Sequence, residues 1–265
     1  ALTVPAPLAH AAVCAGLLAR ALRLPRDPRD LLQIRVEASI GANPETLRTF
    51  GKENAMRVIL TLAVLSLLGS TASAETWRFD GQKTGEPPQG LSCALTGKGR
   101  PGTWTVVADA SAPSASNVLV QADADSTSYR FPHCVAGSAA ATDLDLSVRF
   151  KPVSGSVDQA AGLVWRYRDP DHYYVVRANA RENNVVLYKV EGGRRTDLPV
   201  KGEGRTYGKK APVPSGAWST LAVRVRGALF EVVLDGTKLY EVEDATFAGP
   251  GRVGVWTKAD SVTRF

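Results

Sequence analysis

The chain has 265 residues, of which 44% are hydrophobic and 22% are charged, and its formal net charge is +6. This composition is ordinary for a globular protein, and the length suits one large domain or two small ones. The basic residues do not run together, which argues against nucleic-acid binding. All five Trp and all seven Tyr follow residue 74, so we expect residues 75–265 to be the folded domain.

The first distinctive segment along the chain is "MRVILTLAVLSLLGSTASA", residues 56–74. Met56 and Arg57 give a positive start, residues 58–69 are apolar, and an A-x-A sequence follows at 72–74. This order is typical of a secretory signal peptide. The apolar run is shorter than the roughly 20 residues that a transmembrane helix needs. Its positive flank and its exit through small residues also argue against a buried core helix.

The position of this segment divides the chain into three parts. We predict that residues 1–55, which open on Ala1, are upstream translation outside any domain, and a genuine N-terminal extension is the alternative. Residues 56–74 are then the signal peptide and residues 75–265 the mature domain. We therefore expect a periplasmic or extracellular protein with no transmembrane anchor after cleavage.

Export bears on the cysteines. Cys14 lies in the part that is removed, which leaves Cys93 and Cys134 in the mature domain. An even pair in an oxidising compartment is typical of a disulfide. The bridge would close a loop of about 40 residues and contribute about 4 kcal/mol on the loop-entropy estimate. Two unpaired thiols are the alternative.

From residue 75 onward the apolar residues alternate with polar ones. In "TDLDLSVRFKP", Leu144, Leu146, Val148 and Phe150 fall on one face, which is the pattern of a half-buried strand. The same pattern, bounded by turn sequences, predicts strands at 103–109, 117–122, 143–150, 161–168, 173–179, 185–191, 219–226, 229–234, 238–243 and 251–257. No helix longer than a turn is predicted. The sequence therefore predicts an all-β, two-sheet antiparallel jelly-roll sandwich, with an up-and-down barrel as the alternative.

Two motifs carry a resemblance to a known family. The first is "GLVWRYRDPDHYY", with Gly162, Arg166 and Asp169 before the tyrosine pair, and the second is "GRVGVWTKAD", residues 251–260. Residues 75–265 resemble bacterial concanavalin A-like, laminin-G-like jelly rolls, and are especially similar to the exported 3-keto-disaccharide hydrolase-like domains. The resemblance implies a ligand groove on the concave sheet. It also implies further strand residues beyond Phe265.

The candidate binding residues come from the strands at 161–191. Pairing Arg168 with Tyr173 places the apolar sets of the first two strands together, with Trp165 in the core. Val186, Tyr188 and Val190 of the next strand are expected to join that core. If the strand at 143–150 belongs to the same sheet, the face of that sheet opposite the core is polar and suits a hydroxyl-rich ligand. The candidate ligand-binding residues on this face are Arg166, Tyr173, Arg177, Asn179 and Lys189. The alternative is a solvated face with weak cross-strand ion pairs.

Catalytic patterns are sparse. Asp171 and His172, at the predicted turn, are the candidate acid/base residues. No strand carries acidic residues at i, i+2 and i+4, which argues against conventional glycoside hydrolysis on this fold. No cofactor is predicted. Asp123 and Asp125 are candidate Ca²⁺ ligands, and a solvated polar turn is the alternative.

These features predict an exported carbohydrate-binding or interaction module rather than an enzyme. Its expected partner is a carbohydrate or another hydroxyl-rich ligand. The second hypothesis, implied by the family resemblance, is a hydrolase or lyase that acts on 3-keto-glycosides. The third is a structural envelope protein without a small ligand.

Overall fold

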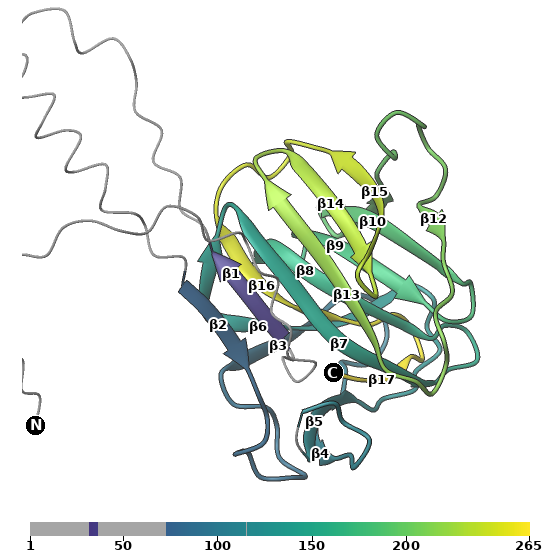
Figure 1. Ribbon diagram of the computed structural model, residues 1–265. Coiled ribbons are helices and arrows are strands. Elements are labelled where there is room, and N and C mark those ends of the chain that lie inside the picture. The colour runs from purple at the N-terminus through teal and green to yellow at the C-terminus, as the bar shows by residue number, and fades with distance from the viewer. Residues whose placement is uncertain (1–31, 37–72, 115) are drawn as a thin grey trace, which may run out of the picture.

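The computed structural model describes residues 32–36, 73–114 and 116–265 (Figure 1). Every regular element in these ranges is a β-strand. In chain order the strands are β1 (Leu32–Val36), β2 (Ser73–Trp77), β3 (Leu91–Gly97), β4 (Trp104–Ala108), β5 (Asn117–Gln121), β6 (Arg130–Ala141), β7 (Leu144–Ser154), β8 (Ala160–Asp169), β9 (His172–Asn179), β10 (Asn184–Glu191), β11 (Arg194–Asp197), β12 (Lys209–Lys210), β13 (Ser219–Arg226), β14 (Leu229–Leu234), β15 (Thr237–Glu243), β16 (Gly251–Trp256) and β17 (Val262–Arg264). Within the described ranges, no helix is long and apolar enough to span a membrane.

The strands form two antiparallel sheets. Sheet A has the order β15-β14-β13-β7-β17-β5-β4, and β1 pairs with both β7 and β2. Sheet B has the order β11-β10-β9-β8-β16-β6-β3, with β12 added at β10. In Figure 1, β7, β13 and β14 lie in front of β8, β9 and β10. This arrangement confirms the all-β, two-sheet jelly-roll sandwich.

The alternating pattern located most of the strands. Each of the ten predicted ranges overlaps an observed strand, whereas none of them covers β1, β2, β3, β6, β11, β12 or β17. Strand β6 breaks the alternation because it contains Pro132 and ends in small residues. The predicted signal peptide lies outside the described residues up to position 72, and its last residues, Ser73 and Ala74, belong to β2.

The main core lies between the sheets. Leu146 and Val148 of β7 belong to the same buried cluster as Leu163 and Trp165 of β8, so Trp165 is a core residue as predicted. Burying one such side chain contributes about 1.5–3 kcal/mol. At one end of this core Cys93 and Cys134 lie directly opposite each other on β3 and β6 and form the predicted disulfide.

Sheet B also has a buried apolar cluster on its outer face, the side turned away from sheet A. We call this cluster the second core. Its members come from five of the sheet's strands and are at most 4% exposed: Phe131, Val135, Ala160, Val164, Tyr167, Tyr173, Val175, Val186, Tyr188, Val190 and Trp256. Strands β8, β9 and β10 are therefore buried on both faces.

The second core is covered because the two edges of sheet B approach each other. The guanidinium of Arg195, on edge strand β11, lies 4.5 Å from the ring centre of Phe131 on β6 and 5.7 Å from that of Trp256 on β16. On the opposite edge, the Thr96 hydroxyl of β3 lies 2.8 Å from the hydroxyl of Tyr173. Contacts between strands this far apart in the sheet order require strong curvature. Sheet B is curled over its own outer face.

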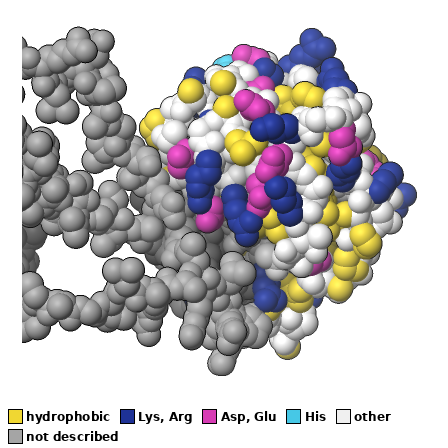
Figure 2. All heavy atoms as spheres, turned by 45° about the horizontal axis from the view of Figure 1, so that its top comes forward, with side chains coloured by type: hydrophobic (Ala, Val, Ile, Leu, Met, Phe, Trp, Pro, Cys, Tyr) yellow, Lys and Arg dark blue, Asp and Glu magenta, His cyan; other side chains and the backbone are white. Residues whose placement is uncertain are grey.

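The outer face of sheet A differs sharply from that of sheet B. Charged side chains of both signs alternate across it, as Figure 2 shows in blue and magenta. Lys238 pairs with Glu231 and Glu241 at 3.2 and 2.6 Å, and Glu231 also pairs with Arg224. Such exposed pairs contribute little to stability. A solvated sheet face with weak cross-strand ion pairs, the alternative that the sequence left open, is therefore found on sheet A.

His133 is enclosed within the curl of sheet B. Its Nδ1 lies 3.1 Å from the carbonyl oxygen of Phe131, and its Nε2 lies 3.3 Å from the hydroxyl of Tyr167. Burial lowers the pKa of His133 to about 4, because the charged imidazolium is poorly solvated there. The residue is therefore neutral in the folded protein near neutral pH.

We expect this histidine to make the protein less stable in mild acid. Between the unfolded pKa near 6.5 and the folded pKa near 4, the unfolded state binds the extra proton, so stability is complete above pH 6.5 and falls as the pH drops. Urea unfolding of the full chain at pH 7 and pH 5 should show a loss of about 2 kcal/mol that is absent from His133→Phe. An equal loss in the variant would contradict this assignment.

Candidate ligand-binding site

The five predicted binding residues do not share one face. Tyr173, Arg177 and Asn179 alternate along β9 on the outer face of sheet B. Lys189 of β10 pairs with Tyr174, so it lies on the inner side, where its Nζ donates to the Thr246 hydroxyl at 2.8 Å. Strand β7, whose membership of the same sheet was a condition of that face, belongs to sheet A. The prediction of a single polar face is wrong.

Arg166 departs from that face because the strand is irregular at this residue. The pairing of β8 with β9 shifts between Trp165 and Asp169, and Arg166 has a φ of 48°. Its guanidinium turns toward the edge of the sandwich and donates to the carbonyl oxygens of Thr142, Gly227 and Phe247 at 3.0, 2.6 and 2.7 Å. Burial lowers its pKa. Arg166 therefore joins structural elements and is not beside Arg177.

The orientation of β10 is also opposite to the prediction. Val186, Tyr188 and Val190 belong to the second core, and Val185 and Leu187 face the main core. The sequence "NVVLYKVE" is apolar at nearly every position, which is the pattern of a strand buried on both faces. Alternation alone cannot orient such a strand.

Tyr173 is on the predicted face but is fully buried. Its hydroxyl lies 2.8 Å from the Thr96 hydroxyl and accepts a hydrogen bond from Trp256 Nε1 at 3.3 Å. Burial raises its pKa, so it stays protonated. The ring is not available to stack on a sugar, which corrects the expected role of this residue.

Asp171 and His172 lie at the turn between β8 and β9. The His172 Nδ1 is 2.9 Å from Asp169, which takes the place expected for Asp171, and both side chains of this pair are partly exposed. Strand β9 separates His172 from Asn179 by about 20 Å at the usual rise per residue. The predicted acid/base pair is therefore remote from the other polar residues of β9.

Arg177 and Asn179 instead meet four residues that sequence analysis did not single out. We call this group the end cluster: Asp158, Arg177, Asn179, Glu182, Asn184 and Lys258. Arg177 donates to Glu182 at 2.8 and 3.2 Å and to Asn184 Oδ1 at 2.8 Å. The Asn179 amide donates to both Asp158 and Glu182, at 2.7 and 3.1 Å. Lys258 completes the group with an ion pair to Asp158 at 2.6 Å.

Two cations balance two carboxylates in the end cluster. Burial acts to raise the pKa of Glu182, but the hydrogen bond and the charge of Arg177 outweigh it and keep that pKa below its usual value. Glu182 is therefore ionised and accepts hydrogen bonds. Arg177 is fully buried, whereas the side chains of Glu182 and Lys258 are 34% and 16% exposed. A ligand can reach the cluster through these two side chains.

The connection between β16 and β17 positions Asp158 and Lys258. The Asp260 carboxylate accepts the backbone N–H groups of Ser156, Val157 and Asp158 at 2.5, 2.9 and 2.9 Å. The hydroxyl of Ser261 accepts the backbone N–H of Ala160 at 2.9 Å. These bonds join the chain before β8, which carries Asp158, to the chain after β16, which carries Lys258, and so hold the two cluster residues in place relative to each other.

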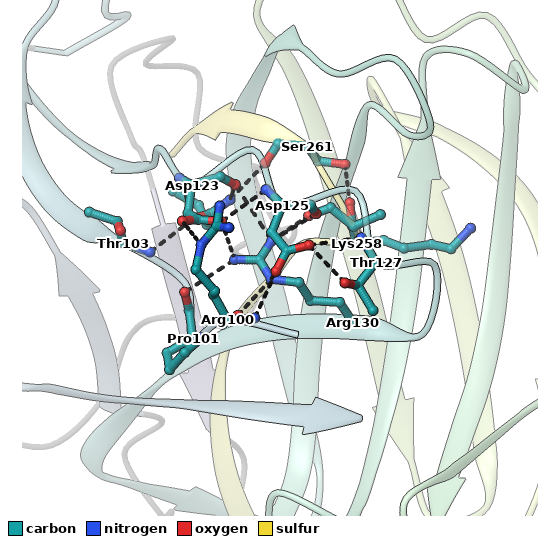
Figure 3. A network of polar contacts seen from close by, with 11 residues as sticks. Arg100, Pro101, Thr103, Asp123, Asp125, Thr127, Arg130, Lys258 and Ser261 are labelled. Atoms are coloured by element: carbon teal, nitrogen blue, oxygen red, sulfur yellow. Dashed lines mark hydrogen bonds and ion pairs between the residues drawn. The ribbon is translucent and has the colours of Figure 1, made fainter. Parts of the chain in front are cut away.

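Arg130 supports the segment that follows β16 through hydrogen bonds to its backbone (Figure 3). It is fully buried and donates to the carbonyl oxygens of Arg100 and Ala259 at 2.6 and 2.5 Å and to Asp123 at 2.9 Å. Asp125 accepts the backbone N–H of Arg100 at 2.7 Å and lies 3.9 Å from Arg130. The candidate Ca²⁺ ligands Asp123 and Asp125 are thus bound by arginines. Across the described ranges, no group of three or more His, Cys, Asp or Glu residues is placed to hold a metal ion.

Tyr207 lies beside the end cluster and is 45% exposed. Its hydroxyl accepts a hydrogen bond from the hydroxyl of Tyr188 at 2.9 Å, and its ring centre is 5.9 Å from the guanidinium of Arg177. It has a φ of 56°, which is unfavourable for a bulky side chain. Backbone outliers of this kind are frequent at ligand sites. Nothing in the local sequence marks this tyrosine in advance.

Comparison with known proteins gives structural likeness only. No protein-family model matches the chain, and no curated protein sequence matches it. A carbohydrate-binding module of class CBM66 from Bacillus subtilis is 18% identical with a TM-score of 0.48, covering 64% of this chain and 89% of that one. Domain 4 of the arabinanase AbnA from Geobacillus stearothermophilus, solved with arabinotriose, is 14% identical (TM-score 0.36; 64% and 83% covered). The galectin LEC-6 from Caenorhabditis elegans is 17% identical (TM-score 0.32; 45% and 79% covered).

Removing the buried cation should be far more damaging than removing an exposed one. In Arg177→Met, Glu182 and Asn184 lose their partner in a buried site, and we expect a loss of about 3–5 kcal/mol in the free energy of unfolding. The matched variant Arg224→Met, on the outer face of sheet A, should lose at most about 1 kcal/mol. Urea unfolding measures both. Similar losses would show that the end cluster contributes no more than a surface ion pair.

Proposed function

We propose that the protein binds carbohydrate, with the ligand at the end cluster and Tyr207 rather than on the open face of a sheet. The observation that carries the proposal is the half-exposed Tyr207 ring beside a balanced group of hydrogen-bond donors and acceptors. An open hollow that adjoins the end cluster at Glu182 is lined by Glu182, Asn183, Lys210, Ala211 and Pro212. Ligand sites typically combine an apolar or aromatic wall with a few placed polar groups.

The chemistry of the site suits hydroxyl groups. A sugar hydroxyl both donates and accepts, so it can donate to the Glu182 carboxylate and accept from the Lys258 ammonium. Hydrogen bonds with ionised partners are about twice as strong as neutral ones. Because Arg177 and Asn179 already orient Glu182, its carboxylate needs little reordering when a ligand arrives.

We favour binding over cleavage of a 3-keto-glycoside. General acid catalysis needs a carboxyl group whose pKa lies near the working pH, and Arg177 lowers the pKa of Glu182. Asp158, the other carboxylate, is 1% exposed and paired with Lys258. A structural envelope role without a ligand gives no reason for an exposed tyrosine at an unfavourable φ.

We also propose that the protein works outside the cytoplasm, in the periplasm or the extracellular space. The Cys93–Cys134 disulfide supports this location, since such bonds persist in oxidising compartments.

Glycan-array binding of the full chain, followed by calorimetry with the best ligand, tests the proposal. Tyr207→Ala should weaken binding at least about ten-fold because the aromatic wall is lost, while Tyr207→Phe should retain most of the affinity. Glu182→Gln should also weaken binding, because the carboxylate is a stronger acceptor than an amide. Arg224→Ala, on the outer face of sheet A, is the control.

Three results would count against the proposal. One is a chain that binds no glycan, and another is binding that these substitutions leave unchanged. The third is turnover of 3-keto-glycosides that is lost in Glu182→Gln, which would favour the enzyme.

A further inference from the structure

Two exposed cations belong to the segments that border the hollow: Lys210 is one of its lining residues, and Arg181 directly precedes the lining residue Glu182 in the chain. The Nζ of Lys210 donates to the backbone carbonyl oxygen of Glu182 at 3.0 Å. Arg181 precedes Glu182 in the same turn, which Asn179 Oδ1 stabilises by accepting the Arg181 N–H at 3.0 Å. Both side chains are exposed. Lys210 is thus anchored beside the end cluster through its ammonium group, and Arg181 through its backbone N–H.

These two cations differ from the other charged groups of the site. Within the cluster each cation has a carboxylate partner, Arg177 with Glu182 and Lys258 with Asp158. On the neighbouring loop, Arg205 pairs with Asp197 and Lys209 with Glu203. In the described part of the chain, neither Arg181 nor Lys210 forms an ion pair with a carboxylate side chain. The site therefore has cationic charge to spare at its rim.

We propose that the glycan bound at this site carries carboxylate groups, as in an oligouronide. This inference rests on the proposed function. A uronide residue has hydroxyl groups for Glu182 and Lys258 and a ring for Tyr207. Its carboxylate, projecting from the ring, matches the donors of Lys210 and Arg181. An Arg–carboxylate pair can be bidentate, which gives geometric selectivity besides charge attraction.

The experiment compares acidic oligosaccharides with neutral copies of themselves. Tetramers of galacturonate, glucuronate, mannuronate and guluronate are titrated into the full chain at low ionic strength, each beside its methyl ester, which removes the charge. We expect at least one tetramer to bind about ten-fold or more tightly than its ester, with the difference shrinking as salt is added.

Paired variants locate the effect. Arg181→Gln with Lys210→Gln should abolish the preference for the acid, so that the tetramer and its methyl ester bind with similar affinity. The control, Arg224→Gln with Lys238→Gln on the outer face of sheet A, removes the same charge from a different surface and should keep the preference.

Other outcomes separate the two proposals. Binding of neutral glycans that needs Tyr207, with no acid preference in any pair, would overturn this inference and leave the proposed function standing. An acid preference that survives in the Arg181 and Lys210 variant would place the carboxylate elsewhere and also overturn it. Failure of every glycan to bind would overturn both.

Discussion

The contact between the two edges of sheet B determines what the rest of the molecule can do. Arg195 reaches from β11 over Phe131 and Trp256, and Thr96 of β3 meets Tyr173 of β9. Aromatic side chains fill the enclosed space, and an arginine over aromatic rings adds about 0.5–2 kcal/mol per contact. The outer face of this sheet is consequently a second core, and a ligand groove along it has no room.

This closure leaves the end of the curled sheet as the place for the ligand site that we propose. There the polar side chains of β9 emerge from the second core and meet the segment that follows β16. Asp260 and Arg130 brace that segment through backbone groups of Asp158 and Ala259. Rigid support of this kind lowers the ordering cost of binding. The end cluster is thus held in a fixed orientation, and in the proposed site Tyr207 and Lys210 add an aromatic wall and a charge at its rim.

The sequence predicted ten of the strands and the disulfide because alternation and an even cysteine pair are local signals. It did not predict which way β10 faces, since Val185 and Val186 are both apolar and the strand is buried on both sides. The side chain of Arg166 leaves the predicted face because the pairing of β8 with β9 is irregular there. The sequence of one strand alone does not indicate such an irregularity. Lys258 and Asp260 lie in the motif that carries the family resemblance, so they were within reach of sequence reasoning. Tyr207 was not, because its place depends on the packing of Tyr188.

The closure of sheet B can be tested directly by chemical nitration of the folded full chain with tetranitromethane, mapped by mass spectrometry. Tyr129 and Tyr207 are 38% and 45% exposed, whereas the other five tyrosines are at most 5% exposed. We predict rapid nitration at these two positions and protection of the rest until the protein is unfolded in urea. Rapid nitration of Tyr173 and Tyr188 in the folded protein would show that the outer face of sheet B is open, and would contradict this account.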